Sequence, residues 1–300
     1  MRRIPYIARV ALLGHLCNWP WRTRMERRRV RGRVIREAAM KYLQPYAEVV
    51  RDVPEEKQDH TEPRRIFSLW LQGVEQAPPL VRACLDSIRR QAAGAELVVL
   101  DGETVFNWIS LPESIVERWK AGKMKAAHFA DICRVELLYR FGGVWMDATD
   151  YLDAPLPEWL WEADFFVYQG GETVSGAYAG IQNCFIRAAR GSYLLKVWRE
   201  AILAYWAAEE TAVDYFVHQL LLMLCVRENA RCAELFKAMP CLDQDPTHML
   251  WYAYADQPYN EALLHQVCAE ALFQKTDYKS DSAVRPIPGS LADHLLKPYR

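Results

Sequence analysis

Residues 126–153 of this chain read AAHFADICRVELLYRFGGVWMDATDYLD, and they decide both the expected fold and the expected chemistry. Apolar side chains recur at helical spacing as far as Phe141, which predicts a short amphipathic helix. Gly142 and Gly143 would end this helix, because glycine tolerates the left-handed conformation at a helix C-terminus. Val144–Met146 is then a short buried strand. Asp147 follows at its carboxyl end, where open α/β sheets bind their ligands.

Charged residues stand on both sides of this strand. Asp131 lies near the start of the predicted helix, and Arg134 lies one turn further on the same face. After the strand, Asp147, Thr149 and Asp150 offer hard oxygen ligands for Mg²⁺ or Mn²⁺. Adjacent side chains of a strand point to opposite faces, so Thr149 and Asp150 would not both ligate unless a loop turned Asp150 inward. The second ligand therefore stays open.

The order of these parts resembles a known family. An Asp-x-x-Arg helix, a Gly-Gly turn, an apolar strand and an Asp-containing motif are similar to the Gly-transf-sug and capsular polysaccharide synthesis glycosyltransferases, which are related to glycosyltransferase family 32. The resemblance covers roughly residues 64–300. Six flanking segments resemble the family in the same order: 66–73 (IFSLWLQG), 78–90 (PPLVRACLDSIRR), 96–101 (ELVVLD), 183–198 (NCFIRAARGSYLLKVW), 214–218 (DYFVH) and 273–279 (FQKTDYK).

The resemblance implies a retaining enzyme that takes a sugar from a nucleotide diphosphate donor, with a uridine diphosphate sugar expected. Asp147 would be a ligand of Mn²⁺ or Mg²⁺, and this ion would stabilise the leaving diphosphate. Asp131 and Arg134 would contact the donor sugar and its phosphates, and Trp70 would stack on the nucleobase. With Asp147, Asp131 and Arg134 form the expected catalytic set. The expected donor-binding residues are Trp70, Gln72, Asp131, Arg134, Gly143, Lys275 and Lys279.

One departure from the family pattern motivates an alternative. The family's Asp-x-Asp motif reads Asp147-Ala148-Thr149 here, so a hydroxyl replaces the second acid. A sugar-nucleotide-binding protein with weak or no turnover would also fit this change, and a membrane-associated adaptor is a further alternative. No carboxylate pair can be assigned as nucleophile and acid/base, so the donor phosphate is expected to help accept the proton of the incoming hydroxyl.

Three further sets of residues have more than one interpretation. Asp214 and His218 are four residues apart, which places them on one face of a predicted helix, either on the acceptor side, on the metal side or as a pair in the core. His248 is a candidate for metal or phosphate contact. Lys275 and Lys279 would neutralise the diphosphate, or would be ordinary solvated lysines.

The first 41 residues differ in charge from the rest of the chain. They contain twelve Lys/Arg and two Glu, and the remainder carries a balance of −11. The apolar segment Ile4–Leu16 is too short and too interrupted to span a bilayer. Beside Trp19, Trp21 and the following arginines it favours contact with an anionic membrane, and a basic helix packed on the domain is the alternative. The acidic remainder and the lack of a nucleic-acid-binding motif disfavour nucleic acid as a partner.

Composition and periodicity predict an α/β protein. The chain is 51% hydrophobic and 25% charged, as is usual for a globular protein, and its eight irregularly spaced cysteines are expected to be buried free thiols in a reducing compartment. We expect a basic region at 1–51, a linker at 52–64 and the catalytic domain at 65–300.

The resemblance implies a GT-A-type, Rossmann-like nucleotide-sugar-binding fold with a helical C-terminal part and a basic helical N-terminal extension. The protein is expected to lie on the cytoplasmic face of the plasma membrane. Its expected partners are a nucleotide-sugar donor and a saccharide or lipid-linked oligosaccharide acceptor. The expected strands are Arg65–Leu71, Glu96–Leu100, 144–147, Phe165–Tyr168 and Ala179–Ile186, and the expected helices are Pro78–Ala92, 104–121 split by Pro112, 126–141, Ser192–Ala208 and Asp214–Glu228.

Overall fold

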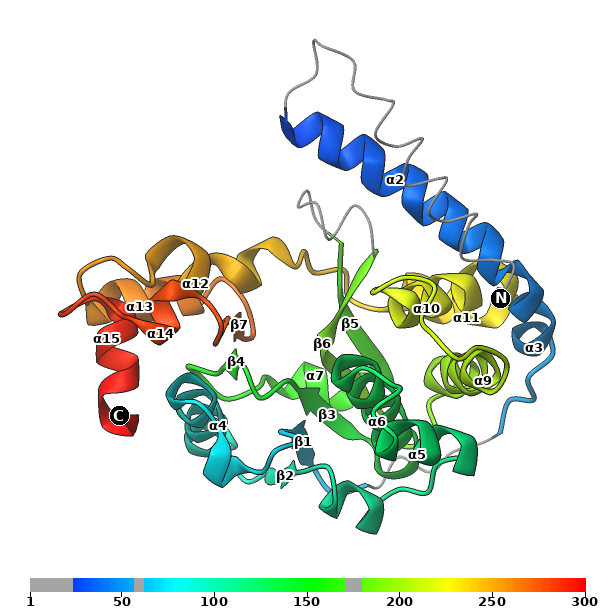
Figure 1. Ribbon diagram of the computed structural model, residues 1–300, viewed down its shortest axis with the longest axis horizontal. Coiled ribbons are helices and arrows are strands. Elements are labelled where there is room, and N and C mark those ends of the chain that lie inside the picture. Colours follow the sequence, from blue (N-terminus) through cyan, green and yellow to red (C-terminus); the bar gives the residue numbers. More distant parts are fainter. Residues whose placement is uncertain (1–23, 57–61, 171–179) are drawn as a thin grey trace.

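A computed structural model describes residues 24–56, 62–170 and 180–300, with side chains from residue 32 onward. A five-stranded sheet of order β2-β1-β3-β6-β5 lies at the centre (Figure 1). Strands β2, β1 and β3 run parallel, and β6 and β5 are antiparallel to their neighbours. The α/β class predicted from the sequence is therefore confirmed. The strands are β1 Arg65–Leu69, β2 Glu96–Leu100, β3 Gly143–Met146, β5 Phe165–Gln169 and β6 Ile181–Ala188.

Helices cover both faces of this sheet. On β2, Val99 packs against the side chains of α4, whereas its neighbours Val98 and Leu100 belong to the main core. Because side chains alternate along a strand, these residues report opposite faces. Helix α6 contacts β1, β3 and β6. The helices are α2 Arg24–Leu43, α3 Ala47–Arg51, α4 Pro79–Gln91, α5 Glu113–Lys120, α6 Ala126–Phe141, α7 Glu158–Glu162, α9 Tyr193–Ala208, α10 Val217–Glu228, α11 Ala230–Ala238, α12 Met249–Tyr254, α13 Glu261–Cys268, α14 Asp281–Val284 and α15 Leu291–Leu296.

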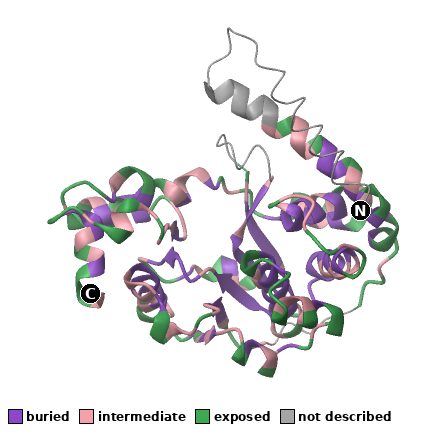
Figure 2. Cartoon of the chain, in the orientation of Figure 1, coloured by how far each residue is buried: buried purple, intermediate pink, exposed green. Residues whose placement is uncertain are grey.

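Helix α6 lies deep in the domain. The predicted bounds are confirmed, but the amphipathic prediction is wrong, because ten of the residues between His128 and Leu138 are buried. The sheet covers one side and α9 packs against another, so polar and apolar positions of α6 are both enclosed (Figure 2). A helix enclosed in this way holds Asp131 and Arg134 inside the protein rather than on its surface.

The Gly-Gly turn connects α6 to β3. Gly142 is the C-cap, with φ of 64°, and its N–H donates to the carbonyl of Leu138 at 2.8 Å, as glycine was expected to allow. Gly143 has φ of 110°, and a Cβ there would lie 2.5 Å from the carbonyl oxygen of Arg65. Glycine is required here because β1 passes too close for any side chain.

A second, smaller sheet and a helical region follow the main sheet. Strand β4 (Asp150–Tyr151) pairs antiparallel with β7 (Gln274–Lys275), so Asp150 lies opposite Lys275. Helices α12, α13 and α15 form their own core around Leu250, Trp251 and Leu264, to which α4 and Tyr151 contribute. In Figure 1 this orange and red region lies beside α4, at the carboxyl ends of β1 and β3.

The N-terminal helices belong to the main core at their carboxyl ends. Helices α2 and α3 contact α10, and Ala39, Leu43, Tyr46 and Val50 are buried there. The predicted membrane segment Ile4–Leu16, with Trp19 and Trp21, lies outside the described residues. None of the described helices has the length and apolar character needed to cross a bilayer. Six of the seven described cysteines are buried free thiols, as expected, and Cys241 is exposed.

Candidate active site

A cleft of about 350 Å³ opens at the carboxyl ends of β1 and β3. Its walls come from segments far apart in the sequence: the end of β1, the first half of α6, the turn after β3, β6, the start of α10 and the segment after β7. The end of a parallel strand pair is where α/β proteins bind nucleotides. The polar lining residues are Trp70, Gln72, Asp131, Arg134, Trp145, Asp147, Thr149, Asn183, Tyr215, Gln219, Tyr278 and Lys279.

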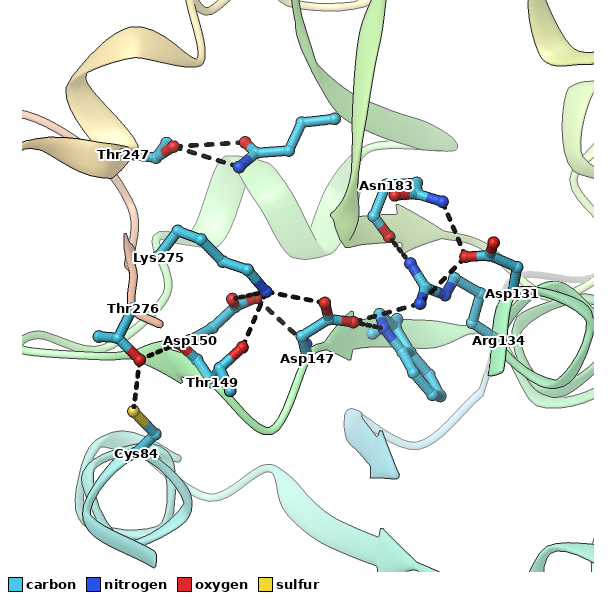
Figure 3. Close-up of polar contacts among 12 residues, drawn as sticks. Cys84, Asp131, Arg134, Asp147, Thr149, Asp150, Asn183, Thr247, Lys275 and Thr276 are labelled. Carbon is cyan, nitrogen blue, oxygen red and sulfur yellow. Dashed lines mark hydrogen bonds and ion pairs between the residues drawn. The ribbon is translucent and has the colours of Figure 1, made fainter. Parts of the chain in front are cut away.

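Arg134 lies at the centre of the cleft floor. Its Nη2 is 3.1 Å from Asp131 Oδ1 and 3.3 Å from Asp147 Oδ1, and its guanidinium stacks 5.0 Å from the ring centre of Trp145. Figure 3 shows the guanidinium between the two carboxylates. Burial opposes the charge, but Asp131 and Asp147 outweigh it and raise the pKa of Arg134 above its usual value. The side chain is a permanently charged bridge between α6 and the turn after β3.

Asp131 is held by the amide of Asn183, which is itself held by the amide of Gln219. Its Oδ1 accepts from Asn183 Nδ2 at 2.9 Å, and Gln219 Nε2 donates to Asn183 Oδ1 at 3.0 Å. Burial would raise the pKa of Asp131, but Arg134 and two neighbouring histidines outweigh burial and hold it at about 2. Asp131 is therefore an ionised acceptor at the edge of the cleft.

The two histidines beside Asp131 do not form a metal site with it. His128 Nδ1 and His218 Nδ1 lie 3.7 and 3.6 Å from Asp131 Oδ2. Trp206 Nε1–H donates to His218 Nε2 at 2.8 Å, so Nδ1 carries the proton of this neutral ring. A protonated nitrogen cannot bind a metal ion. Burial lowers the pKa of His218 to about 4, which keeps the ring neutral.

A tight turn after β3 brings three oxygen ligands together. Asp150 N–H donates to the Asp147 carbonyl at 2.9 Å, and Asp147 N–H donates back to Asp150 Oδ2 at 3.1 Å. Lys275 Nζ lies 2.8 Å from Asp147 Oδ2, 2.9 Å from Thr149 Oγ1 and 3.1 Å from Asp150 Oδ1 (Figure 3). Adjacent side chains of a strand would point to opposite faces, but this turn directs Thr149 and Asp150 to the same point.

The residues of this group shift one another's pKa values. Burial opposes ionisation of Asp147, but Lys275 and Arg134 outweigh it and lower its pKa. Burial lowers the pKa of Lys275, yet Asp147 and Asp150 raise it well above its ordinary value. Burial and the neighbouring Asp147 carboxylate raise the pKa of Asp150 to about 8, although Lys275 and the N–H of Asp147 lower it. Because both Asp150 oxygens face donors, the geometry fits the carboxylate form that the ammonium accompanies.

The predicted metal ligands have the right chemistry for a divalent ion, but the space between them is occupied. The oxygens of Asp147, Thr149 and Asp150 are hard ligands that converge on one point, as Mg²⁺ or Mn²⁺ requires. The Lys275 ammonium fills that point, so a divalent ion does not fit among them while Lys275 stays in place. His248 is not brought to the group: its Nδ1 contacts Thr247 Oγ1 at 3.0 Å and the Gln244 carbonyl at 3.3 Å.

The aromatic end of the cleft contains Trp70. Its ring lies edge-on to Tyr278 with ring centres 5.2 Å apart, and its buried Nε1 has no hydrogen-bond partner among the described residues. Gln72 and Lys279 line the same cleft, and the Lys279 ammonium lies 5.2 Å from the ring centre of Tyr278. The three predicted donor-binding residues Trp70, Gln72 and Lys279 therefore line the same cleft as the charged residues.

Gly143 and Asp214 are placed differently from expectation. Gly143 begins β3, at the opposite end of the strand from Asp147, so it does not line the cleft and its role is to let β1 pass. Asp214 precedes α10 instead of lying on it, since its Oδ1 accepts from the N–H of Phe216 at 2.8 Å and forms a turn there. His218 is fully buried behind Asp131, where it cannot reach an acceptor.

Comparison with known proteins identifies the family of this chain. The sequence model of the family described as capsular polysaccharide synthesis protein matches residues 22–295. The chain belongs to this family. The predicted membership is therefore confirmed at this level, while the relation to glycosyltransferase family 32 and the metal motif stay predictions.

Curated relatives of this chain bear glycosyltransferase names. Glycosyltransferase afumC of Aspergillus fumigatus is 28% identical over 55% of this chain and 46% of its own length. O-glycosyltransferase braB of Annulohypoxylon truncatum is 26% identical over 55% and 44%. O-glycosyltransferase PaGT of Phomopsis amygdali is 25% identical over 58% and 46%. The chain spans about half the length of the curated relatives it matches.

A solved structure named PaToxG Glycosyltransferase aligns over 90% of this chain and 98% of its own, at 13% identity and a TM-score of 0.41, a likeness too weak to assign a fold.

The sequence analysis did not identify some residues of the site. Asn183 and Gln219 fix Asp131, and Tyr215 and Tyr278 line the cleft. The available signal was a polar residue inside an apolar element, Asn183 in β6 and Gln219 in α10.

Proposed function

We propose that this protein transfers a sugar from a nucleotide diphosphate donor, expected to be a uridine diphosphate sugar, to a hydroxyl group of an acceptor. One observation carries the proposal: Asp131, Arg134 and Asp147 line the cleft with alternating charges, and Lys275 continues the alternation behind Asp147. Cations beside a diphosphate and a carboxylate beside sugar hydroxyls are what donor binding needs. Membership of the capsular polysaccharide synthesis family supports the same activity.

The donor would span the cleft from Trp70 to Asp131. Trp70 would stack on the nucleobase, and its unpaired Nε1–H is free to donate to the ligand. Lys279, on the same wall, would meet a phosphate. Asp131 is ionised and fixed by Asn183, so its oxygens could accept hydrogen bonds from the donor sugar.

Bond cleavage would be assisted by the charges around Asp147. As the bond between the anomeric carbon and the phosphate oxygen breaks, negative charge develops on the diphosphate. Arg134 and Lys275 lie 3.3 and 2.8 Å from the two Asp147 oxygens and would stabilise that charge. The acceptor oxygen would bond to the anomeric carbon, and its proton would pass to the leaving phosphate oxygen.

Retention of the anomeric configuration is part of the proposal. Asp131 and Asp147, the carboxylates that line the cleft, are both paired with Arg134. A carboxylate held by a guanidinium is a poor nucleophile, so transfer on one face of the sugar, with the donor phosphate as base, is the better account. Proton NMR of the product tests this step, and an inverted anomeric proton would refute it.

The acceptor and the cellular setting are finer parts of the proposal. A saccharide or lipid-linked oligosaccharide hydroxyl is the acceptor expected for polysaccharide synthesis, and two relatives are named O-glycosyltransferases. Contact with an anionic membrane surface through the basic N-terminal region is also proposed. The sequence-based prediction of Mn²⁺ or Mg²⁺ dependence is untested, and the contacts of Lys275 with Asp147, Thr149 and Asp150 argue against an ion at that point.

The decisive experiment measures donor hydrolysis over a panel of nucleotide sugars, each with Mn²⁺ and with EDTA. Wild type should release nucleotide from one donor, and Asp147→Ala should lower the rate by about 100-fold or more, because it removes the one carboxylate that contacts both cations. Lys237→Met, on the exposed face of α11, is the control. Nucleotide binding without release would favour the alternative of a silent sugar-nucleotide-binding protein, and absence of binding would reject the proposed function.

A further inference from the structure

The point where a metal ion was expected is a complete cation site with a cation already in it. Asp147, Thr149 and Asp150 present one oxygen each, and Lys275 Nζ lies within 2.8–3.1 Å of all three. The side chain of Asp150 is fully buried, whereas those of Asp147 and Lys275 are 28% and 19% exposed. The ammonium is therefore anchored by the buried Asp150 and lies directly behind Asp147 and Thr149, which line the cleft.

Lys275 is held at this point by its backbone as well as by its charge. It belongs to β7, which pairs with β4 at Asp150. On one side of it Gln274 is fully buried, and it accepts from Leu250 N–H and donates to the carbonyls of Pro246 and Val267. On the other side Thr276 donates through its N–H and its hydroxyl to the Thr149 carbonyl. Displacing the ammonium would leave Asp150 without a cation and Asp147 with Arg134 alone.

Two fixed charges together equal the charge of a divalent ion. Asp147 Oδ2 faces Lys275, and Asp147 Oδ1 faces Arg134 and the indole N–H of Trp145. Both cations are anchored by a further carboxylate, Asp150 or Asp131. The group therefore places two positive charges on either side of one carboxylate, in the wall of the cleft.

Given the proposed glycosyl transfer, we propose that Lys275 replaces the divalent metal ion in this protein: its ammonium, with Arg134, stabilises the diphosphate leaving group, and donor binding needs no metal. An ammonium has three N–H donors, and Lys275 uses all three. A phosphate oxygen would therefore displace the neutral Thr149 hydroxyl, because the two carboxylates are the stronger acceptors.

The test compares wild type with Lys275→Met, which keeps the length of the side chain and removes its charge. Calorimetry measures UDP binding, with GDP as a second probe, in EDTA and in Mn²⁺. Mn²⁺ binding without nucleotide is measured separately from the electron paramagnetic resonance signal of the free ion. Lys237→Met controls for the loss of a lysine elsewhere.

Wild type should bind nucleotide in EDTA and should take up no Mn²⁺ on its own. Lys275→Met should bind nucleotide about 10- to 100-fold more weakly in EDTA, as expected for a lost hydrogen bond to a charged group. It should also take up Mn²⁺ among the freed oxygens of Asp147, Thr149 and Asp150, and Mn²⁺ should restore part of the nucleotide affinity. Lys237→Met should behave as wild type in every measurement.

The opposite pattern would overturn the inference: wild type that binds nucleotide only with Mn²⁺, or that takes up Mn²⁺ as tightly as Lys275→Met. If Lys275→Met does not fold, as judged by circular dichroism, the two wild-type measurements decide alone. Wild type that binds neither nucleotide under either condition rejects the proposed function instead, and the Mn²⁺ titration still reports whether Lys275 excludes the ion.

Discussion

Two charged clusters meet at Asp147, which lines the cleft, and they are assembled in different ways. The Arg134 cluster (Asp131, Arg134 and Asn183) lies on α6 and β6 inside the main core. The Lys275 cluster (Thr149, Asp150 and Lys275) depends on pairing of β4 with β7, which joins residues 125 positions apart. Asp147 contacts both clusters. The comparison separates a region that the sheet alone fixes from one that needs the C-terminal region to dock.

The largest effect is expected in the Arg134 cluster. Arg134→Met leaves Asp131 and Asp147 without their shared cation in a buried position. Removing one partner of a buried ion pair costs about 3–5 kcal/mol, so the free energy of unfolding should fall by that amount. Urea denaturation followed by tryptophan fluorescence measures it.

Arg231→Met is the matched control, because Arg231 also faces two carboxylates, Glu55 and Glu234, but on the surface. Its denaturation curve should overlay that of wild type, since water solvates both partners. Equal losses for the two variants would contradict the view that Arg134 is a buried bridge.

The second effect concerns acid. Burial lowers the pKa of His218 to about 4 in the folded protein, whereas an unfolded histidine titrates near its ordinary value of 6.5. The unfolded chain therefore binds more protons between these values, and the folded protein should lose stability as the pH falls from 6.5 to 4. The loss at this one site is on the order of 3 kcal/mol.

Measuring the free energy of unfolding at several pH values tests this expectation. In His218→Gln the decline between pH 6.5 and 4 should flatten. His265→Asn is the control, because His265 is exposed beside Asp153 and its pKa is raised instead, so the decline should persist. A decline that is unchanged in His218→Gln would show that the buried ring is not its source.

The same division explains what the sequence predicted. The bounds of β2 and α6 match expectation because each is set by a local apolar run and a glycine or polar boundary. Helix α10 begins three residues later than predicted, because Asp214 bonds to the N–H of Phe216 and forms a turn. The two-residue strands β4 and β7 have no local pattern, since only their pairing with each other defines them.

Site residues follow the same rule. Asp131, Arg134 and Asp147 were found because one continuous stretch of sequence contains them. Lys275 was expected to meet the diphosphate, but its contact with three oxygens of the turn depends on a fold-level pairing that no spacing reveals. The amphipathic prediction for α6 failed for a related reason: α9 covers a face that the sequence alone assigns to solvent.

A smaller effect should separate the two clusters. Gln274→Leu leaves the Leu250 N–H and the carbonyls of Pro246 and Val267 without their partner. A buried unpaired group costs about 1–3 kcal/mol, and the cost should fall on the docking of β7. Amide hydrogen exchange should speed up around Leu250 and Lys275 and stay slow in α6. Uniform loss of protection would mean that the two clusters unfold as one.

The smallest effect is expected at Thr149. Thr149→Val removes the neutral acceptor of Lys275 and keeps both carboxylates, so the unfolding free energy should fall by only about 1 kcal/mol. Nucleotide affinity in EDTA should be unchanged or slightly higher, because the phosphate no longer has to displace a hydroxyl. If Thr149 were instead a metal ligand, the same variant would weaken nucleotide binding only when Mn²⁺ is present. In that case the cation at Arg134 would be permanent, whereas the site of Lys275 would accept a metal ion. Calorimetry of this single variant, with and without Mn²⁺, distinguishes a lysine site from a metal site.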